Sequence, residues 1–341
     1  MIDTRVLAER LVAAGVADVR IDGTTRAVYS SDASLYRIPP LAVVAPHDAD
    51  EVAAVLAICR ADGVPVTARG AGTSIAGNAV GAGVVLDFSR HMNRVLAVDA
   101  ATATATVQPG VVQEVLQRAA APHGLRFGPD PSSSSRCTLG GMIGNNACGT
   151  RALGYGRTSD NVTGLRGLTG GGESLDAATL TDGLRRVGRV GLATIRTEFG
   201  RFGRQVSGYA LENLLPEKGF DPVLLLVGSE GTLAVVTEAT VRLVAEPAHR
   251  LLVVLGYPDI AAAGDATPRV LTHGPVACEG IDSRIVDVVR ERLGPQAVPP
   301  LPRGAAWLFV ELTGDDAAGV IDRGNRLGAD AGAVESLVVT D

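Results

Sequence analysis

The stretch that decides the fold is Ala68-Arg69-Gly70-Ala71-Gly72-Thr73-Ser74-Ile75-Ala76-Gly77-Asn78, which directly follows a strand expected at residues 64–68. Glycine reaches left-handed conformations without steric cost, so consecutive backbone amides can turn inward and form a nest for a phosphate or pyrophosphate. Thr73 and Ser74 can add hydroxyl donors. Taken alone, the stretch is equally compatible with a tight structural turn.

Two common nucleotide-binding motifs do not fit this stretch. A Rossmann site requires G-x-G-x-x-G at the opening of a helix, but Ile75 occupies the third glycine position. A P-loop requires Gly-Lys-Ser/Thr, and residues 68–78 contain no lysine. The loop therefore indicates neither a dinucleotide site of the Rossmann type nor hydrolysis of a nucleoside triphosphate.

A second backbone-rich segment runs from Thr138 to Gly149, preceded by Pro129-Asp130-Pro131. Few of its side chains are large enough to keep a flat or extended molecule away from the main chain. Asn145 and Asn146 add amide donors and acceptors. This composition suits a heteroaromatic cofactor, and close packing of a short helix on a sheet is the alternative interpretation.

A third segment, Gly228-Ser229-Glu230-Gly231-Thr232-Leu233, separates apolar runs at 223–227 and 234–244 that both read as strands. By itself this segment predicts only a hairpin turn.

The elements around the first loop indicate a mixed fold. A strand at 41–45, a helix at 50–61 and the strand at 64–68 predict a parallel βαβ unit. Farther along, a strand at 84–88, a hairpin-like pair within 95–108 and a helix at 111–121 follow.

After about residue 248 the pattern becomes a regular alternation of strands and helices. We expect strands at 251–256, 277–281, 307–312 and 336–340, separated by helices at 260–271, 283–293 and 315–327. These elements predict a second α/β or α+β domain, which we expect to be incomplete where the sequence stops at a strand end.

Composition narrows the class of protein. The chain has 341 residues, enough for two domains, and is 46% hydrophobic and 20% charged, as ordinary globular proteins are. A net charge of -6 argues against general nucleic-acid binding, and the longest apolar runs of about five residues predict no membrane span. No secretion signal is evident at the N-terminus, so we expect a cytoplasmic protein. The four cysteines and five histidines show no metal-binding spacing, so no metal site is predicted.

Together, the three glycine-rich segments resemble the FAD-binding domain of the vanillyl-alcohol-oxidase-like, or PCMH-type, flavoproteins. More narrowly, residues 84–95, 107–110, 127–131 and 138–149 are similar to the FAD-linked D-2-hydroxy-acid dehydrogenases, especially large bacterial members with a C-terminal iron-sulfur part. The resemblance implies an α+β fold: a PCMH-type FAD-binding domain at residues 1–247, followed by a partial α/β cap (substrate) domain at 248–341.

The same resemblance implies the role of each segment. Residues 69–78 would wrap the FAD pyrophosphate, residues 138–149 would line the isoalloxazine ring and ribityl chain, and residues 228–236 would approach the adenine half. Thr73 stands where some relatives attach the flavin through a histidine, so non-covalent FAD is expected. The implied cofactor-binding residues are Arg69, Gly70, Ala71, Gly72, Thr73, Ser74, Gly77, Asn78, Pro129, Thr138, Gly140, Gly141, Gly144, Asn145, Asn146, Gly149, Glu230, Gly231 and Val236.

The implied activity is oxidation of a small D-2-hydroxy acid, such as D-lactate, glycolate or D-2-hydroxyglutarate, to the 2-oxo acid. The sequence departs from the family because it lacks the histidine-rich HGHxGDGNxH-type segment that holds a metal and activates the substrate hydroxyl. We therefore name no catalytic base, and interpret His249 and His273 as structural or surface residues. Electrons would leave for an acceptor or iron-sulfur part outside this chain, which could place the protein peripherally at a membrane. A stand-alone flavin-binding or electron-transfer subunit and an FAD-dependent sugar or alcohol oxidase remain as alternatives.

Overall fold

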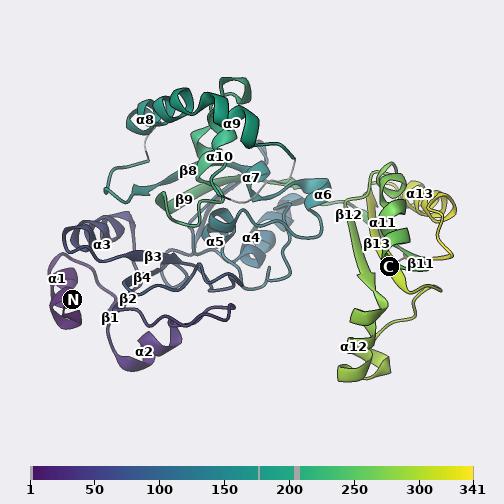
Figure 1. Ribbon diagram of the computed structural model, residues 1–341, viewed down its shortest axis with the longest axis horizontal. Coiled ribbons are helices and arrows are strands. Elements are labelled where there is room, and N and C mark those ends of the chain that lie inside the picture. Colours follow the sequence, from purple (N-terminus) through teal and green to yellow (C-terminus); the bar gives the residue numbers. More distant parts are fainter. Residues whose placement is uncertain (1–2, 176, 203–207, 341) are drawn as a thin grey trace. The chain divides into compact units, whose positions relative to one another are not determined.

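The structure is a computed structural model that describes residues 3–175, 177–202 and 208–340. The chain divides into two compact units. The first comprises residues 1–127, 131–147 and 157–244, and the second comprises residues 128–130, 148–156 and 245–341. Figure 1 labels the elements, and each unit is described by itself.

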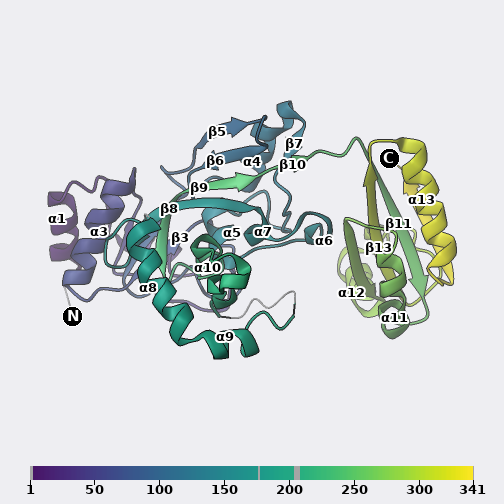
Figure 2. The ribbon, with the colours of Figure 1, turned by 90° about the horizontal axis from the view of Figure 1, so that it is seen from above.

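The first sheet of the first unit contains the βαβ unit expected from the sequence. Its strand order is β1-β2-β4-β3, and both β2 and β3 pair in parallel with β4, which lies between them. Buried side chains of α1, α3 and the sheet form one core, and Figures 1 and 2 draw α1 beside α3. The bounds are α1 Thr4–Ala13, β1 Val19–Arg20, α2 Gly23–Val28, β2 Ala42–Val44, α3 Ala49–Ala61, β3 Val66–Arg69 and β4 Val84–Asp87.

The second sheet of this unit is antiparallel, with strand order β5-β6-β9-β8. Its core joins the strands to the buried faces of α4 and α5. A short pair, β7 with β10, forms separately. The bounds are β5 Val95–Asp99, β6 Thr104–Val107, α4 Gln113–Ala120, β7 Leu125–Arg126, α5 Leu139–Asn145, α7 Thr158–Asn161, β8 Val162–Thr169, α8 Ala177–Val190, α9 Leu192–Glu198, β9 Ala234–Arg242 and β10 Val244–Ala245.

The strand predicted at 223–227 is wrong, because this run forms helix α10, Pro222–Leu226. Asp221 caps the helix: its side chain accepts hydrogen bonds from the amides of Val223 and Leu224 at 2.9 and 3.1 Å. Pro222 follows at the first helical position, where its fixed φ suits a helix and its missing N–H costs nothing. The Asp-Pro start therefore outweighs the β-like run of apolar residues behind it.

The second unit is a four-stranded antiparallel sheet with the order β12-β13-β11-β14. Helices alternate with strands as expected, and side chains alternate across the sheet. On β11, Leu251 and Leu255 join the core under α11 and α13, whereas Val254 packs with Val286 of α12. Figure 2 shows α13 along this sheet. The bounds are β11 His249–Tyr257, α11 Ile260–Leu271, β12 Ala277–Asp282, α12 Ser283–Leu293, β13 Ala306–Gly314, α13 Ala317–Asp330 and β14 Glu335–Thr340.

Two short segments that interrupt the first unit along the chain, residues 128–130 and 148–156, belong to the second unit. The second segment includes helix α6, Ala152–Tyr155. Arg151 anchors it, because its guanidinium donates to both oxygens of Glu311 on β13 at 2.8 and 2.9 Å and to Asp130 at 2.8 Å. The side chain of Arg151 is only 22% exposed, so this ion pair is better shielded from water than a surface pair.

None of the helices within the described residues combines the length and apolar character needed to cross a bilayer.

Candidate functional site

The first glycine-rich loop leaves the end of β3 and is built around its own arginine. Gly72 has a φ of +68°, and a Cβ there would lie 2.5 Å from the Arg69 guanidinium. Arg69 also donates to the carbonyl of Ala79 at 3.0 Å, so it ties the start of the loop to the residue after its end. Burial lowers the pKa of Arg69. The loop thus holds a fixed, partly buried guanidinium beneath its backbone.

The polar side chains within this loop are joined by hydrogen bonds. The Ser74 hydroxyl donates to the side-chain oxygen of Asn78 at 3.3 Å and accepts from the Ala76 amide at 3.2 Å. Gly77, at a φ of +86°, packs against Tyr36, whose ring a Cβ would meet at 2.6 Å. Gly77 therefore shapes the loop without lining its cavity.

The second segment, residues 138–149, contains the short helix α5, Leu139–Asn145. A short helix was the alternative interpretation of this segment in the sequence analysis. Thr138 is the N-cap, and its hydroxyl accepts from the Gly141 amide at 3.3 Å. Two glycines permit close approaches: a Cβ on Gly70 would lie 2.0 Å from the Thr138 hydroxyl, and a Cβ on Gly140 would lie 2.7 Å from Pro109. The first loop and the start of α5 are therefore in direct contact.

The third segment packs against the end of α5. The amides of Gly228 and Glu230 donate to the carbonyls of Ile143 and Gly144, each at 2.9 Å. These bonds satisfy carbonyls that a helix C-terminus otherwise leaves without partners. They also fix the third segment beside the second, although Asn145 and Glu230 are 85 positions apart in sequence.

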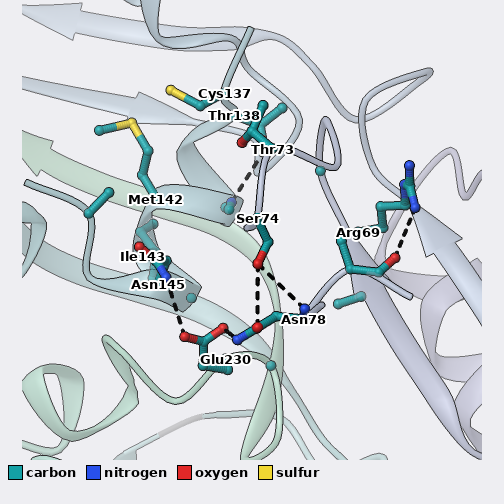
Figure 3. Close-up of a pocket in the computed structure, with 18 of the residues that line it drawn as sticks. Arg69, Thr73, Ser74, Asn78, Cys137, Thr138, Met142, Ile143, Asn145 and Glu230 are labelled. Atoms are coloured by element: carbon teal, nitrogen blue, oxygen red, sulfur yellow. Dashed lines mark hydrogen bonds between the residues drawn. The ribbon is translucent and has the colours of Figure 1, made fainter. Parts of the chain in front are cut away.

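Glu230 joins all three segments through its side chain. Its carboxylate accepts hydrogen bonds from the amide groups of Asn78 in the first loop and Asn145 at the end of α5, the latter at 3.3 Å. Figure 3 shows both asparagines reaching the same carboxylate. Burial raises the pKa of Glu230, and the hydrogen bond from Asn145 opposes that rise. Its backbone φ of +57° is unusual for a residue with a side chain.

These segments enclose a cavity of about 250 Å³ within the first unit. Most of the residues nominated from the sequence line it, drawn partly in Figure 3. Those that line it are Arg69, Gly70, Ala71, Gly72, Thr73, Ser74, Asn78, Thr138, Gly140, Gly141, Gly144, Asn145, Glu230, Gly231 and Val236.

Four nominated residues do not line the cavity. Gly77 packs against Tyr36, as described above. The side-chain oxygen of Asn146 accepts from the Ser159 amide at 2.9 Å, so Asn146 fixes the start of α7 and its own left-handed turn, with φ of +52°. Pro129 and Gly149 lie in the segments that belong to the second unit.

Other residues line the cavity without having been nominated from the sequence. They are mostly small or apolar side chains, for which neither charge nor glycine spacing provides a signal. Some of them nevertheless lie in the stretches that carried the family resemblance, namely Phe88, Pro109, Pro131, Met142, Ile143 and Ala147. The lining residues in question are Ala68, Ile75, Ala76, Ala79, Phe88, Pro109, Pro131, Ser133, Cys137, Met142, Ile143, Ala147, Leu226, Ser229 and Ala234.

The cavity combines features that suit a flavin nucleotide. One wall offers glycine backbone beside the Arg69 guanidinium, which favours an anion such as a pyrophosphate. Another offers apolar side chains, including Met142, Ile143 and Val236, that suit an aromatic ring. Because six glycines line the cavity, the main chain itself forms part of this surface; they are Gly70, Gly72, Gly140, Gly141, Gly144 and Gly231. The residues present therefore fit a dinucleotide with a flat ring system.

Possible metal ligands and acid-base side chains were also sought in the structure. Among the described residues, no group of three or more His, Cys, Asp or Glu side chains could hold a metal ion. His273, considered from the sequence, pairs with Asp330 at 3.1 Å in the second unit.

Comparison with known proteins defines the class. A model described as "FAD binding domain" matches residues 40–178, and one described as "FAD linked oxidases, C-terminal domain" matches residues 246–335. The chain belongs to the family of FAD-linked oxidases of the vanillyl-alcohol-oxidase and PCMH type, and its cofactor is FAD.

Its relatives include a D-2-hydroxyglutarate dehydrogenase of Pseudomonas putida, 35% identical over 79% of this chain and 29% of the relative. The D-2-hydroxyglutarate dehydrogenase of Escherichia coli is 32% identical over 89% of this chain and 32% of the relative. The glycolate oxidase subunit GlcD of Bacillus subtilis is 36% identical over 85% of this chain and 55% of the relative. The chain thus spans about a third of these dehydrogenases and about half of GlcD.

Solved structures of alkyldihydroxyacetonephosphate synthase share the fold. Two of them match with TM-scores of 0.70 and 0.72 at 19% identity, and cover 98% and 97% of this chain and 60% and 62% of their own. At this identity the likeness establishes the fold alone.

Proposed function

We propose that this chain supplies the FAD-binding portion of an enzyme that oxidises a D-2-hydroxy acid to the corresponding 2-oxo acid. The observation that carries the proposal is the meeting of three glycine-rich segments at one cavity, in a chain whose relatives are named D-2-hydroxyglutarate dehydrogenase and glycolate oxidase subunit. The candidate substrates are D-lactate, glycolate and D-2-hydroxyglutarate.

Each segment has a proposed role at the cofactor. Residues 69–78 would hold the pyrophosphate through backbone amides, with the Arg69 charge beneath them. Residues 138–145 and Ala147 would line the isoalloxazine ring and ribityl chain, and residues 228–236 would approach the adenine half. Non-covalent binding is proposed, since the Thr73 side chain lacks the imidazole through which some relatives attach the flavin.

In the proposed oxidation, the cofactor and the protein have different tasks. When bound, FAD supplies the acceptor for the hydride that leaves the α-carbon of the substrate. The proposed task of this chain is to hold the ring in a fixed orientation and to shield one side of it from water. We assign no residue of this chain to removal of the hydroxyl proton.

A second candidate is that the chain acts as a flavin-binding subunit completed by another chain. The description of the Bacillus subtilis relative as a subunit favours this alternative. In either case, we propose that electrons pass to an acceptor or iron-sulfur part outside this chain and that the protein is cytoplasmic.

The test is reconstitution with FAD followed by anaerobic titration. Purified protein should take up FAD and show a flavin absorbance spectrum after removal of the excess. Bleaching by D-lactate, glycolate or D-2-hydroxyglutarate, but not by L-lactate, would support the oxidation reaction in this chain. Bound FAD that only a partner chain renders reducible would support the subunit alternative. Bleaching by sugars or simple alcohols instead would contradict the assigned substrate class, and failure to bind FAD would contradict the whole proposal.

A further inference from the structure

A second cavity, of about 180 Å³, lies in the first unit. It is formed by residues around β1, α2 and β2 together with Arg90, which follows β4. It shares no lining residue with the cavity described above. Its volume corresponds to about six water molecules at ~30 Å³ each, which suits a molecule of a few heavy atoms.

The charges that line this cavity are arranged around one carboxylate. Asp18 pairs with Arg20 at 2.8 Å and lies 3.7 Å from Arg90. Outside the cavity lining, His91 also pairs with Asp18 at 3.2 Å. Burial disfavours ionisation of Asp18, but the hydrogen bonds from Arg20 and His91 outweigh it and hold its pKa below the usual range.

Two guanidinium groups therefore face the cavity with one carboxylate between them, a formal lining charge of +1. Each guanidinium carries five N–H donors, of which a single pairing uses one or two. Both arginine side chains are 43–44% exposed, so an anion from solution can reach them. Two further carboxylates lie near these groups, because Asp22 acts on Arg20 and Asp87 accepts from the Tyr29 hydroxyl. It is therefore the remaining guanidinium donors that favour one additional carboxylate.

The lining also includes apolar side chains. Val28, Val43 and Ala45 line the same cavity, together with Thr24, Thr25 and Tyr29. An inorganic anion would gain nothing from these side chains, whereas a short hydrocarbon body would remove their apolar surface from water. The lining therefore matches a molecule with a charged end and a small apolar end.

We propose that this second cavity binds a short-chain organic carboxylate, its charged group at Arg20 and Arg90 and its hydrocarbon body against Val28 and Val43. The site goes beyond the proposed oxidation reaction and does not depend on it, because the cavity has its own residues. Tyr29 forms part of its wall, and the same side chain lies beneath Arg69, whose guanidinium is 5.0 Å from the ring centre.

The probe for this site is butyrate, with butyramide as its neutral counterpart and inorganic phosphate as the other source of anionic charge. Isothermal calorimetry and ligand-observed NMR on the FAD-loaded protein should detect butyrate binding and no butyramide binding. Phosphate should displace butyrate only weakly, since it lacks the apolar body. Equal binding of phosphate and butyrate would contradict the organic part of the proposal, and absence of butyrate binding would contradict all of it.

Substitutions in the second cavity test whether butyrate binds there. The double variant R20Q/R90Q should weaken butyrate binding at least tenfold, while R118Q, the same change at an exposed position of helix α4, should leave it unchanged. If the double variant does not fold, V28D provides an independent test: Val28 is 62% exposed, so the substitution is tolerated but places a negative charge in the cavity. Unchanged butyrate binding in V28D and in a folded R20Q/R90Q would overturn the assignment.

Discussion

The carboxylate of Glu230 occupies the cavity in which an anionic cofactor group is proposed to bind. It holds Asn78 and Asn145 and sits on a backbone with φ of +57°, a conformation that costs of the order of 1 kcal/mol or more for a residue with a Cβ. The hydrogen bonds from the asparagines and from the Glu230 amide to Gly144 offset that cost. A glutamate at this position therefore organises the cavity but also brings a negative charge into it.

The first prediction follows from this charge. Burial raises the pKa of Glu230 above the ordinary glutamate value of 4.5, so the FAD-free protein loses stability as pH rises from that value through the raised folded pKa. A nearby pyrophosphate would raise this pKa further, because like charges disfavour ionisation. FAD affinity should therefore fall as pH rises from the pKa of Glu230 in the FAD-free protein to its higher pKa in the FAD-bound protein, by up to about tenfold per pH unit.

Equilibrium titrations of FAD fluorescence between about pH 4.5 and about pH 8 measure this dependence. The variant E230Q, which keeps a side-chain oxygen but removes the charge, should flatten it. E9Q, on the exposed side of α1, is the control for loss of one negative charge and should keep the wild-type slope. A slope in E230Q equal to that of the wild type would assign the pH dependence to another group.

At the scale of elements, the first loop and α5 are fitted to one another through a glycine. Gly70 leaves space for the Thr138 hydroxyl, and that hydroxyl caps the helix by accepting from Gly141. A side chain at position 70 would therefore disturb both the loop and the start of the helix.

We predict that G70A weakens FAD binding by about tenfold or more, equivalent to about 1.4 kcal/mol. The added Cβ would lie 2.0 Å from the Thr138 hydroxyl, so either the cap or the loop must shift. G264A in α11 is the matched control, because nothing lies within 4 Å of a Cβ there. It should be neutral or stabilise the protein by up to ~1 kcal/mol. FAD titration together with thermal unfolding measures both effects, and unchanged affinity in G70A would show that the contact does not shape the site.

Local patterns in the sequence were sufficient to predict much of this architecture. Strand, helix and strand at 41–68 predicted the parallel unit, and glycine spacing singled out the three segments. The strand predicted at 223–227 failed because a five-residue apolar run fits a buried strand or a buried helix equally well, and the cap at Asp221 decided between them.

The side-chain contacts between the three segments could not be predicted from such local patterns. Asn78 and Glu230 are 152 positions apart, so no local pattern indicates that their side chains meet. Asn146 was predicted from the sequence to bind the cofactor, but it does not line the cavity. Its neighbour Asn145 does, whereas a left-handed turn directs Asn146 to the Ser159 amide. Residue type alone does not distinguish these two asparagines.

At the scale of the whole molecule, each unit has a hydrophobic core of its own. Leu86 on β4 and Leu255 on β11 are both fully buried, the first in a core of the first unit and the second in a core of the second. Every residue that lines the proposed FAD cavity belongs to the first unit. A substitution in the core of the second unit should therefore lower the stability of that unit without weakening FAD binding.

We predict that L86A and L255A each destabilise their own unit by about 2–5 kcal/mol, the usual cost of a buried leucine-to-alanine change. Only L86A should weaken FAD binding. Calorimetry with and without FAD tests this, because a ligand at about 100 times its dissociation constant stabilises the unit that binds it by about 2.7 kcal/mol. Excess FAD should thus recover part of the stability lost in L86A and none of that lost in L255A. If FAD raised the stability of both variants equally, the two units would unfold as one, and the cavity in the first unit would be coupled to the core of the second.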